Sequence, residues 1–176
     1  MIRTMSGLRL RPLQESDLDP LSVLFTPEGD PWSNVEFAQS DLHKRRFSTD
    51  GGISDDSGLL SIEDERGQLI GHISWYSVHH APTRAAAALN IGVALFASAR
   101  GRGYGAEAHR QLVKYLFATK LIGRIEAVTG ADNHAERLTL ESVGFTLEGT
   151  LRHAGYWDGE WRDFVIYSIL RGEAIR

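Results

Sequence analysis

The chain has 176 residues, a length that suits one domain with a buried core. Hydrophobic residues make up 42% of it and charged residues 24%, which argues against a disordered or fibrous protein. Lys and Arg total 19 against 23 Asp and Glu, so the net charge is −4 and no general affinity for nucleic acid is expected. The absence of cysteine excludes disulfides, zinc–thiolate and iron–sulfur sites, and a cysteine-bound acyl intermediate.

No apolar run approaches the ~18 residues that a membrane span needs, and residues 1–13 lack the apolar core of a signal peptide. We therefore expect a cytoplasmic protein with no membrane partner. We also expect residues 1–176 to form a single domain, since no repeat, low-complexity tract or long linker interrupts them.

The N-terminal part of the chain predicts one strand and two helices. Leu8 to Leu13 alternates apolar and basic residues, which is the period of a half-buried strand. Ser16 or Asp17 can cap the helix that follows, and a second helix is predicted over 33–47.

The rest of the chain predicts two further helices and six strands. The strands are expected near 59–62, 69–78, 87–97, 124–129, 145–156 and 161–170, and the helices from about 104 to 119 and from 133 to 143. The strand at 87–97 is almost wholly apolar, so it should be central and covered on both faces. The order β-α-α-β-β-β-α-β-α-β-β predicts an α/β fold: a mixed, mostly antiparallel sheet with helices on both faces.

A glycine-rich turn joins the central strand to the longest helix. It reads Arg100-Gly101-Arg102-Gly103-Tyr104-Gly105. Glycines let a backbone approach a ligand closely, and the first N–H groups of a helix have no partner inside the helix. Together with the helix dipole, they form a site suited to phosphate.

Three classes of phosphate-binding turn, and a purely structural turn, compete for this segment. A Walker loop is excluded because no Gly-x-x-x-x-Gly-Lys-Ser/Thr run occurs. The dinucleotide fingerprint Gly-x-Gly-x-x-Gly fits poorly, since the spacing here is Gly-x-Gly-x-Gly and the preceding strands read as antiparallel hairpins. The pyrophosphate loop of coenzyme A-dependent acetyltransferases fits the residues.

At this turn the sequence resembles the GNAT acetyltransferases, in particular the ribosomal-protein N-terminal acetyltransferase branch. Arg100, Gly103 and Gly105 match the Gln/Arg-x-x-Gly-x-Gly/Ala signature of that family. Downstream, Asn133 leads into Gly144-Phe145 as the family's Asn…Gly-Phe segment does. The resemblance extends from Leu8 to Leu170.

The resemblance implies acetyl-CoA as cosubstrate and assigns residues to it. Backbone groups of Val93, Ala94 and Leu95 would hold the pantetheine arm, and an N–H there would stabilise an oxyanion. The diphosphate would be bound by Arg100, Gly101, Arg102, Gly103, Tyr104, Gly105 and Ala106, and Asn133 would hydrogen-bond the coenzyme. Asn133 and Glu136 also have the spacing of a capping pair, a role that can coexist with ligand contact.

The family's usual catalytic groups are missing from this chain. A tyrosine acid seven residues after the asparagine is replaced by Leu140, a serine three residues after it by Glu136, and a carboxylate of the central strand by Asn90. We therefore expect direct attack of an amine on the thioester, with Glu126 as the candidate base, acting through water. The alternative for Glu126 is a strand-edge salt bridge.

Two further side chains are candidates for the acceptor site. Trp32, between the first two helices, is expected to wall the acceptor pocket as that region does in relatives, with core packing as the alternative. His72 is a weaker candidate on a strand facing core or cleft. No histidine pair has metal-binding spacing, so no metal is expected.

The sequence thus predicts an acetyl-CoA-dependent N-acetyltransferase that acts on a primary amine, either a protein N-terminus or a small molecule. A non-catalytic acyl-CoA-binding domain and, more remotely, a dinucleotide-binding oxidoreductase are the alternatives. The protein is expected to be a monomer or a homodimer, depending on whether an exposed final strand pairs with a second copy.

Overall fold

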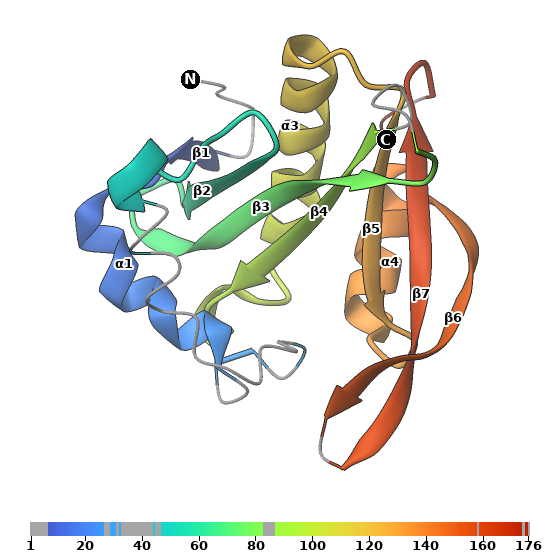
Figure 1. Ribbon diagram of the computed structural model, residues 1–176. Helices are drawn as coiled ribbons and strands as arrows, with labels where there is room; N and C mark the ends of the chain where they lie inside the picture. The colour runs from blue at the N-terminus through green and yellow to red at the C-terminus, as the bar shows by residue number, and fades with distance from the viewer. Residues whose placement is uncertain are drawn as a thin grey trace.

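The computed structural model describes residues 7–26, 29–30, 32, 44, 47–82, 87–157, 159–173 and 175. Over these residues the chain forms a mixed sheet with helices on both faces, which confirms the predicted fold class (Figure 1). The second helix predicted over 33–47 falls largely outside the described residues. Of the described residues in and just after this range, residue 44 and residues 47–50 are helical.

The sheet has seven strands in the order β1-β2-β3-β4-β5-β7-β6. β4 and β5 are parallel, and every other neighbouring pair is antiparallel. The strands are β1 (Arg9–Pro12), β2 (Ser57–Glu63), β3 (Leu69–His79), β4 (Ala87–Leu95), β5 (Arg124–Gly130), β6 (Thr146–Trp157) and β7 (Glu160–Leu170). The final strand is inserted between β5 and β6, so β6 forms the edge of the sheet and β7 does not.

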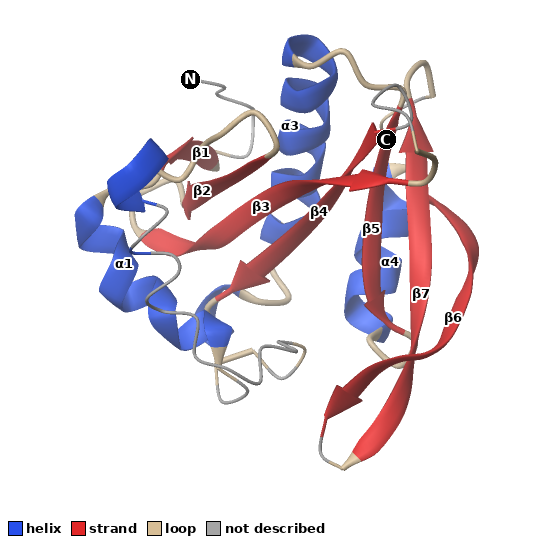
Figure 2. Ribbon diagram, viewed as in Figure 1, coloured by secondary structure: helices blue, strands red, loops and turns tan. Residues whose placement is uncertain are grey.

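Helices α3 (Tyr104–Thr119) and α4 (His134–Val143) cover one face of the sheet, and α1 (Glu15–Ser22) covers part of the other (Figure 2). The apolar stripe predicted for α3 is buried, with Leu112, Val113 and Leu116 at 0% exposure. These side chains pack against the inward-facing side chains of β3, β4 and β5 in the main core. None of the helices in the described part of the chain is long and apolar enough to cross a bilayer.

Beneath α1 lies a second, smaller core. It contains Leu13, Leu21, Leu24 and Leu59, and the outer-face side chains of Ala94 and Phe96 pack against it. The two cores together hold the C-terminal end of β4 from both faces. The central strand is thereby fixed where the glycine-rich turn begins.

A glycine in β2 lies directly beneath the largest buried side chain. A Cβ at Gly58 would come within 2.1 Å of Cζ2 of Trp75, which is 1% exposed. We expect Gly58→Ala to lower the free energy of unfolding by about 1–3 kcal/mol, because the indole would have to leave its rotamer or shift the sheet. Urea unfolding measures this difference.

Gly149→Ala in β6 is the matched control, because a Cβ there meets nothing within 4 Å. The control variant should unfold at a urea concentration close to that of the wild-type protein. Equal stability of the two variants would contradict the packing described here.

Candidate functional site

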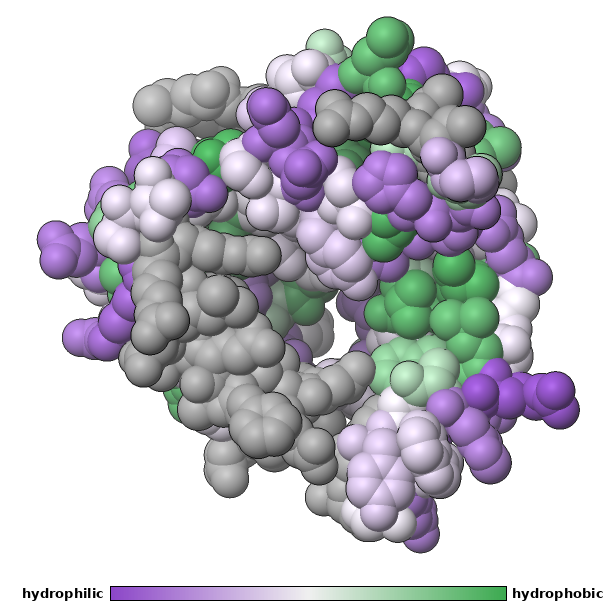
Figure 3. Space-filling model, viewed as in Figure 1, coloured by the Kyte–Doolittle hydropathy of each residue, from purple (hydrophilic) through white to green (hydrophobic). Residues whose placement is uncertain are grey.

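The candidate site is the gap that opens between the two parallel strands at the centre of the sheet. β4 and β5 pair only at Leu89–Ile125 and Asn90–Glu126. Beyond these pairs they diverge toward their C-terminal ends like the arms of a V, and the surface is hollowed at the open end (Figures 1 and 3). A cleft of about 510 Å³ lies between the arms.

The cleft collects nearly all the residues that the sequence assigns to the coenzyme. Its walls include Val93, Ala94, Leu95, Arg100, Gly101, Gly103, Tyr104, Gly105, Ala106 and Asn133. Arg102 is exposed and does not line the cleft; its guanidinium lies 5.0 Å from the centre of the Tyr104 ring. The other predicted coenzyme residues, which extend over 40 positions from Val93 to Asn133, are brought to one cavity.

The glycine-rich turn has the backbone geometry that an anion site requires. Gly101 and Gly103 have φ of +70° and +81°, a region that favours glycine, and Gly103 is the N-cap residue immediately before α3. A Cβ at either position would meet nothing within 4 Å, so both glycines border open space. The first N–H groups of α3, at its positive end, therefore face a cavity that an anion can enter.

Arg100 connects the cleft to the loop that follows α1. Its Nε donates to the carbonyl of Leu95 at 2.9 Å, and its Nη2 donates to the carbonyl of Gly29. The Arg100 guanidinium thus ties the end of β4 to a segment about 70 residues earlier in the chain. The sequence suggests a charged phosphate contact for this residue, and the structure adds this tethering role.

Asn133 caps α4 and lines the cleft at the same time. Its Oδ1 accepts the backbone N–H of Glu136 at 3.2 Å, and its Nδ2 donates to Thr129 Oγ1 at 3.0 Å. In a capping pair the Glu136 side chain would accept the backbone N–H of Asn133. Here the Glu136 carboxylate instead contacts Nε2 of the buried His109 at 2.8 Å. Coenzyme contact by Asn133 stays a prediction.

Trp32 lies at the mouth of the cleft, in the loop after α1. It is one of the lining residues, and a Cβ on Gly130 would come within 3.1 Å of its ring. The indole therefore packs against the end of β5, opposite the β4 end that Arg100 holds. This position is compatible with the predicted acceptor wall.

Sequence reasoning missed two carboxylates in the cleft, Asp30 and Glu136. Burial raises the pKa of Asp30, and the negative charge of Glu136 adds to this effect, while the Trp32 N–H and Arg100 oppose it. The available signal for Asp30 was its position two residues before Trp32, in a segment that the sequence shows only as a break between helices.

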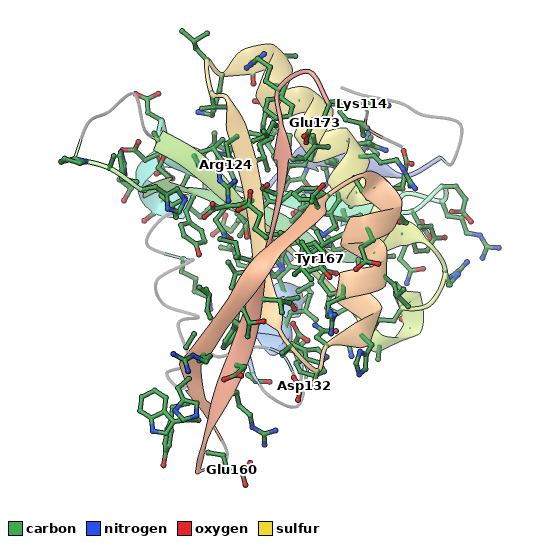
Figure 4. The ribbon with its side chains drawn as sticks, turned by 90° about the vertical axis from the view of Figure 1, so that its right-hand side faces the viewer. Lys114, Arg124, Asp132, Glu160, Tyr167 and Glu173 are labelled. Atoms are coloured by element: carbon green, nitrogen blue, oxygen red, sulfur yellow. The ribbon has the colours of Figure 1, made fainter. Side chains whose placement is uncertain are left out.

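Glu126 is on the face of the sheet opposite α3 and α4, outside the cleft lining. Its Oε2 accepts from Arg124 Nε at 3.0 Å and lies 2.8 Å from His80 Nε2, and the residue is 3% exposed. Arg124 and Asp132 mark opposite ends of β5 in Figure 4, and the partners of Glu126 lie toward the Arg124 end. The salt bridge named as the alternative is present, and any proton transfer to Glu126 from the cleft would pass through water.

His72 borders a different cavity. It is buried on β3, its ring centre lies 4.8 Å from that of Phe25, and it lines a cavity of about 260 Å³ beneath α1. The structure does not bring His72 together with the glycine-rich turn. Among the described residues, no group of three or more His, Cys, Asp or Glu side chains could hold a metal ion.

The comparison with protein families settles what kind of domain this is. Residues 7–146 match the model described as an acetyltransferase (GNAT) domain. The chain belongs to the GNAT acetyltransferase family. The segment matched runs from the start of β1 past α4 and includes both arms of the cleft.

Individual relatives of this GNAT chain agree with the family match. It is 29% identical over 130 residues to the Bacillus subtilis protein named "Putative ribosomal N-acetyltransferase YdaF", covering 74% of this chain and 66% of that relative. The match thus spans just under two thirds of the relative's own length.

Two solved structures share the fold. Spermidine N-acetyltransferase from Vibrio cholerae, in complex with CoA and spermine, superposes with a TM-score of 0.78 at 17% identity, covering 94% of this chain and 96% of that one. Mycobacterium smegmatis RimJ, in complex with CoA-disulfide, superposes with a TM-score of 0.72 at 24% identity, covering 93% and 82%.

Gly103, the N-cap residue of α3, gives a direct test of the anion site. We expect Gly103→Ala to weaken coenzyme A binding by about 10- to 100-fold, the value of one charge-assisted hydrogen bond, because the added methyl group would enter the cavity in front of the N–H groups. Isothermal titration calorimetry with coenzyme A measures the change.

Gly159→Ala is the matched control, since Gly159 in the β6–β7 turn also has a positive φ, +76°, and open space around it. Both variants should lose about 1–2 kcal/mol of stability from the left-handed backbone. Coenzyme affinity should fall only in Gly103→Ala; unchanged affinity there would remove the anion site.

Proposed function

We propose that this protein is an N-acetyltransferase that transfers the acetyl group of acetyl-CoA to a primary amine. The observation that carries the proposal is the shared cleft: the open glycine turn of α3 and the diverging edge of β4 face one cavity. A diphosphate bound at the turn leaves its pantetheine arm free to run along β4. The family membership and the names of the relatives support the same activity.

The divergence of β4 from β5 leaves backbone groups of β4 available for catalysis. From Ile91 onward the β5 side of β4 has no strand partner, so its N–H and C=O groups can bind the pantetheine amides. An N–H in the stretch Val93 to Leu95 would donate to the thioester oxygen as negative charge develops on it. Asn133, which already lines the cleft, would add a hydrogen bond to the coenzyme.

The transfer itself needs no covalent enzyme intermediate. The neutral amine attacks the thioester carbonyl, the C–N bond forms, and the C–S bond breaks. One proton leaves the amine and one is gained by the departing thiolate, which gives the amide and free coenzyme A. The chain contains no cysteine that could carry the acetyl group.

The acceptor is expected to be an α-amine or another weakly basic amine. A lysine-like amine of pKa ~10.4 is neutral for only about 0.04% of the time at pH 7, which costs roughly 4.6 kcal/mol, whereas an α-amine of pKa ~7.8 costs about 1 kcal/mol. The relative named for ribosomal N-acetylation supports a protein N-terminus. The spermine in the crystal structure of the Vibrio cholerae enzyme supports testing polyamines as well.

A thiol-release screen tests the proposal. We expect acetyl-CoA turnover with one or more members of a panel of peptides, polyamines, amino acids and aminoglycosides. Between pH 6 and 9, a peptide α-amine should react faster than Nα-acetyllysine, because less free energy is spent on deprotonation. A clear preference for the lysine side chain would contradict the proposed acceptor class.

A non-catalytic acyl-CoA-binding domain is the second candidate. The observation in its favour is Leu140, which replaces the usual tyrosine acid and is fully buried in the core, away from the cleft lining. Both candidates bind coenzyme A, but only the enzyme releases thiol when an amine is present. The screen therefore separates them.

Glu126 is retained as the candidate base that acts through water. If Glu126 is the base, Glu126→Gln lowers kcat by about 100-fold, the low end of the range for general base catalysis, and alters the pH profile. Steady-state rates from pH 6 to 9 measure both effects.

Glu148→Gln is the matched control, because Glu148 bonds the same Arg124 at 2.6 and 2.7 Å from the exposed side. It should disturb the salt bridge without changing the pH profile. Full activity of Glu126→Gln at every pH would remove this residue from the mechanism.

A further inference from the structure

Two residues that follow α1, Gly29 and Trp32, contact the two sides of the cleft at the open end of the V. On the β4 side, Arg100 bonds the carbonyl of Gly29; on the β5 side, the Trp32 ring packs over Gly130. Asp30 lies between these two contacts and lines the cleft. Its carboxylate therefore shares a cleft with the edge of β4 along which the thioester is expected.

The Asp30 carboxylate has one oxygen available for a ligand. Oδ1 accepts the backbone N–H of Trp32 at 3.2 Å, which fixes the orientation of the group. No other described residue donates a hydrogen bond to this carboxylate or forms an ion pair with it. A mostly buried carboxylate in this state is stabilised by a cation that enters the cleft.

The other charged groups that the structure describes near Asp30 are bonded to protein groups. Arg100 faces it from the turn before α3, but its guanidinium is bonded to two carbonyls. Glu136 faces it from α4, bonded to His109. Glu126 is at the β4–β5 pairing itself, on the sheet face opposite α3 and α4, and is bonded to Arg124 and His80.

We propose that Asp30 is the residue that receives the acceptor: its carboxylate binds the incoming ammonium group and takes the proton that this group must lose. This proposal rests on the proposed function. The ammonium N–H proton passes to Asp30 Oδ2, the freed lone pair attacks the thioester carbon, and the C–S bond breaks. The nitrogen, which is cationic after the attack, gives its second proton to the departing thiolate, so that the amide and free coenzyme A form, and Asp30 returns the first proton to solvent.

The environment of Asp30 suits this exchange. Burial raises the pKa of Asp30, with Glu136 adding to and Arg100 opposing the effect, so its basicity exceeds that of an ordinary carboxylate. It remains a better match for an α-ammonium group than for a lysine side chain, whose pKa is about 10.4. Trp32 gives the acceptor an aromatic wall beside the carboxylate.

The test compares Asp30→Asn with the wild-type enzyme on two acceptors, the tripeptide Ser-Ala-Gly and spermidine, with acetyl-CoA. We expect kcat/KM for the acceptor to fall by about 100-fold, as for loss of a general base. The dissociation constant of coenzyme A, measured by calorimetry, should change less than twofold, which also shows that the variant is folded. Asp132→Asn is the matched control: it removes a half-exposed carboxylate that does not line the cleft and should retain full activity.

Two further readouts separate proton removal from a structural role. Wild-type kcat/KM should fall as the pH drops through the raised Asp30 pKa, and this acid limb should vanish in Asp30→Asn. With 4-methoxyaniline, an aromatic amine that is uncharged at pH 7, Asp30→Asn should lose less than tenfold.

Retention of wild-type rates and of the acid limb in Asp30→Asn, while the wild-type enzyme acetylates the probes, would overturn the role of Asp30 and leave the proposed function intact. Absence of thiol release by the wild-type enzyme with every acceptor in the panel would overturn both.

Discussion

The divergence of β4 from β5 is the constraint on which the rest of the site depends. Two parallel strands that paired along their whole length would satisfy each other's backbone groups and leave no room for a ligand. Here they pair at two positions and separate, because α3 and the small core under α1 hold the end of β4 while α4 packs beside β5. The unpaired arm of β4 is the surface that a thioester can use.

The carboxylates near this gap differ in what surrounds them. Glu126 is buried and bonded to Arg124 and His80. Glu136, in the first turn of α4, is bonded to His109 of α3. Asp30 is partly buried, and among the described residues it accepts one hydrogen bond, from the backbone N–H of Trp32. Residue type alone does not distinguish these three groups; they differ in whether a side chain is bonded to the carboxylate.

The sequence predicts the parts of the site that depend on local chemistry. The turn at Gly101 and Gly103, the cap at Asn133 and the apolar stripe of α3 follow from positive φ, N-cap preference and helical period, and the structure has all three. Long-range contacts are not coded locally. The bond from Arg100 to Gly29 joins residues 71 apart and that from His80 to Glu126 residues 46 apart, so neither could be anticipated, and Asp30 could not be placed in the cleft.

The position of β7 was likewise beyond sequence reasoning. Asp158-Gly159, between the last two predicted strands, is a hairpin signal and predicts that β6 and β7 are neighbours, but it does not say which of them joins β5. The structure places β7 inside the sheet through an antiparallel ladder with β5 that extends from Arg124 to Gly130. Register with a distant strand depends on packing of the whole sheet.

The sparse pairing of β4 with β5 also determines where the native state is expected to open transiently. Strands β1 to β4 form one continuous antiparallel ladder and β5 to β7 another, and only two residue pairs join them. This seam has the fewest backbone hydrogen bonds in the sheet's interior, so transient opening of the native state should begin there. A coenzyme lying along the seam would add cross-links between the halves and slow amide exchange on both sides of it.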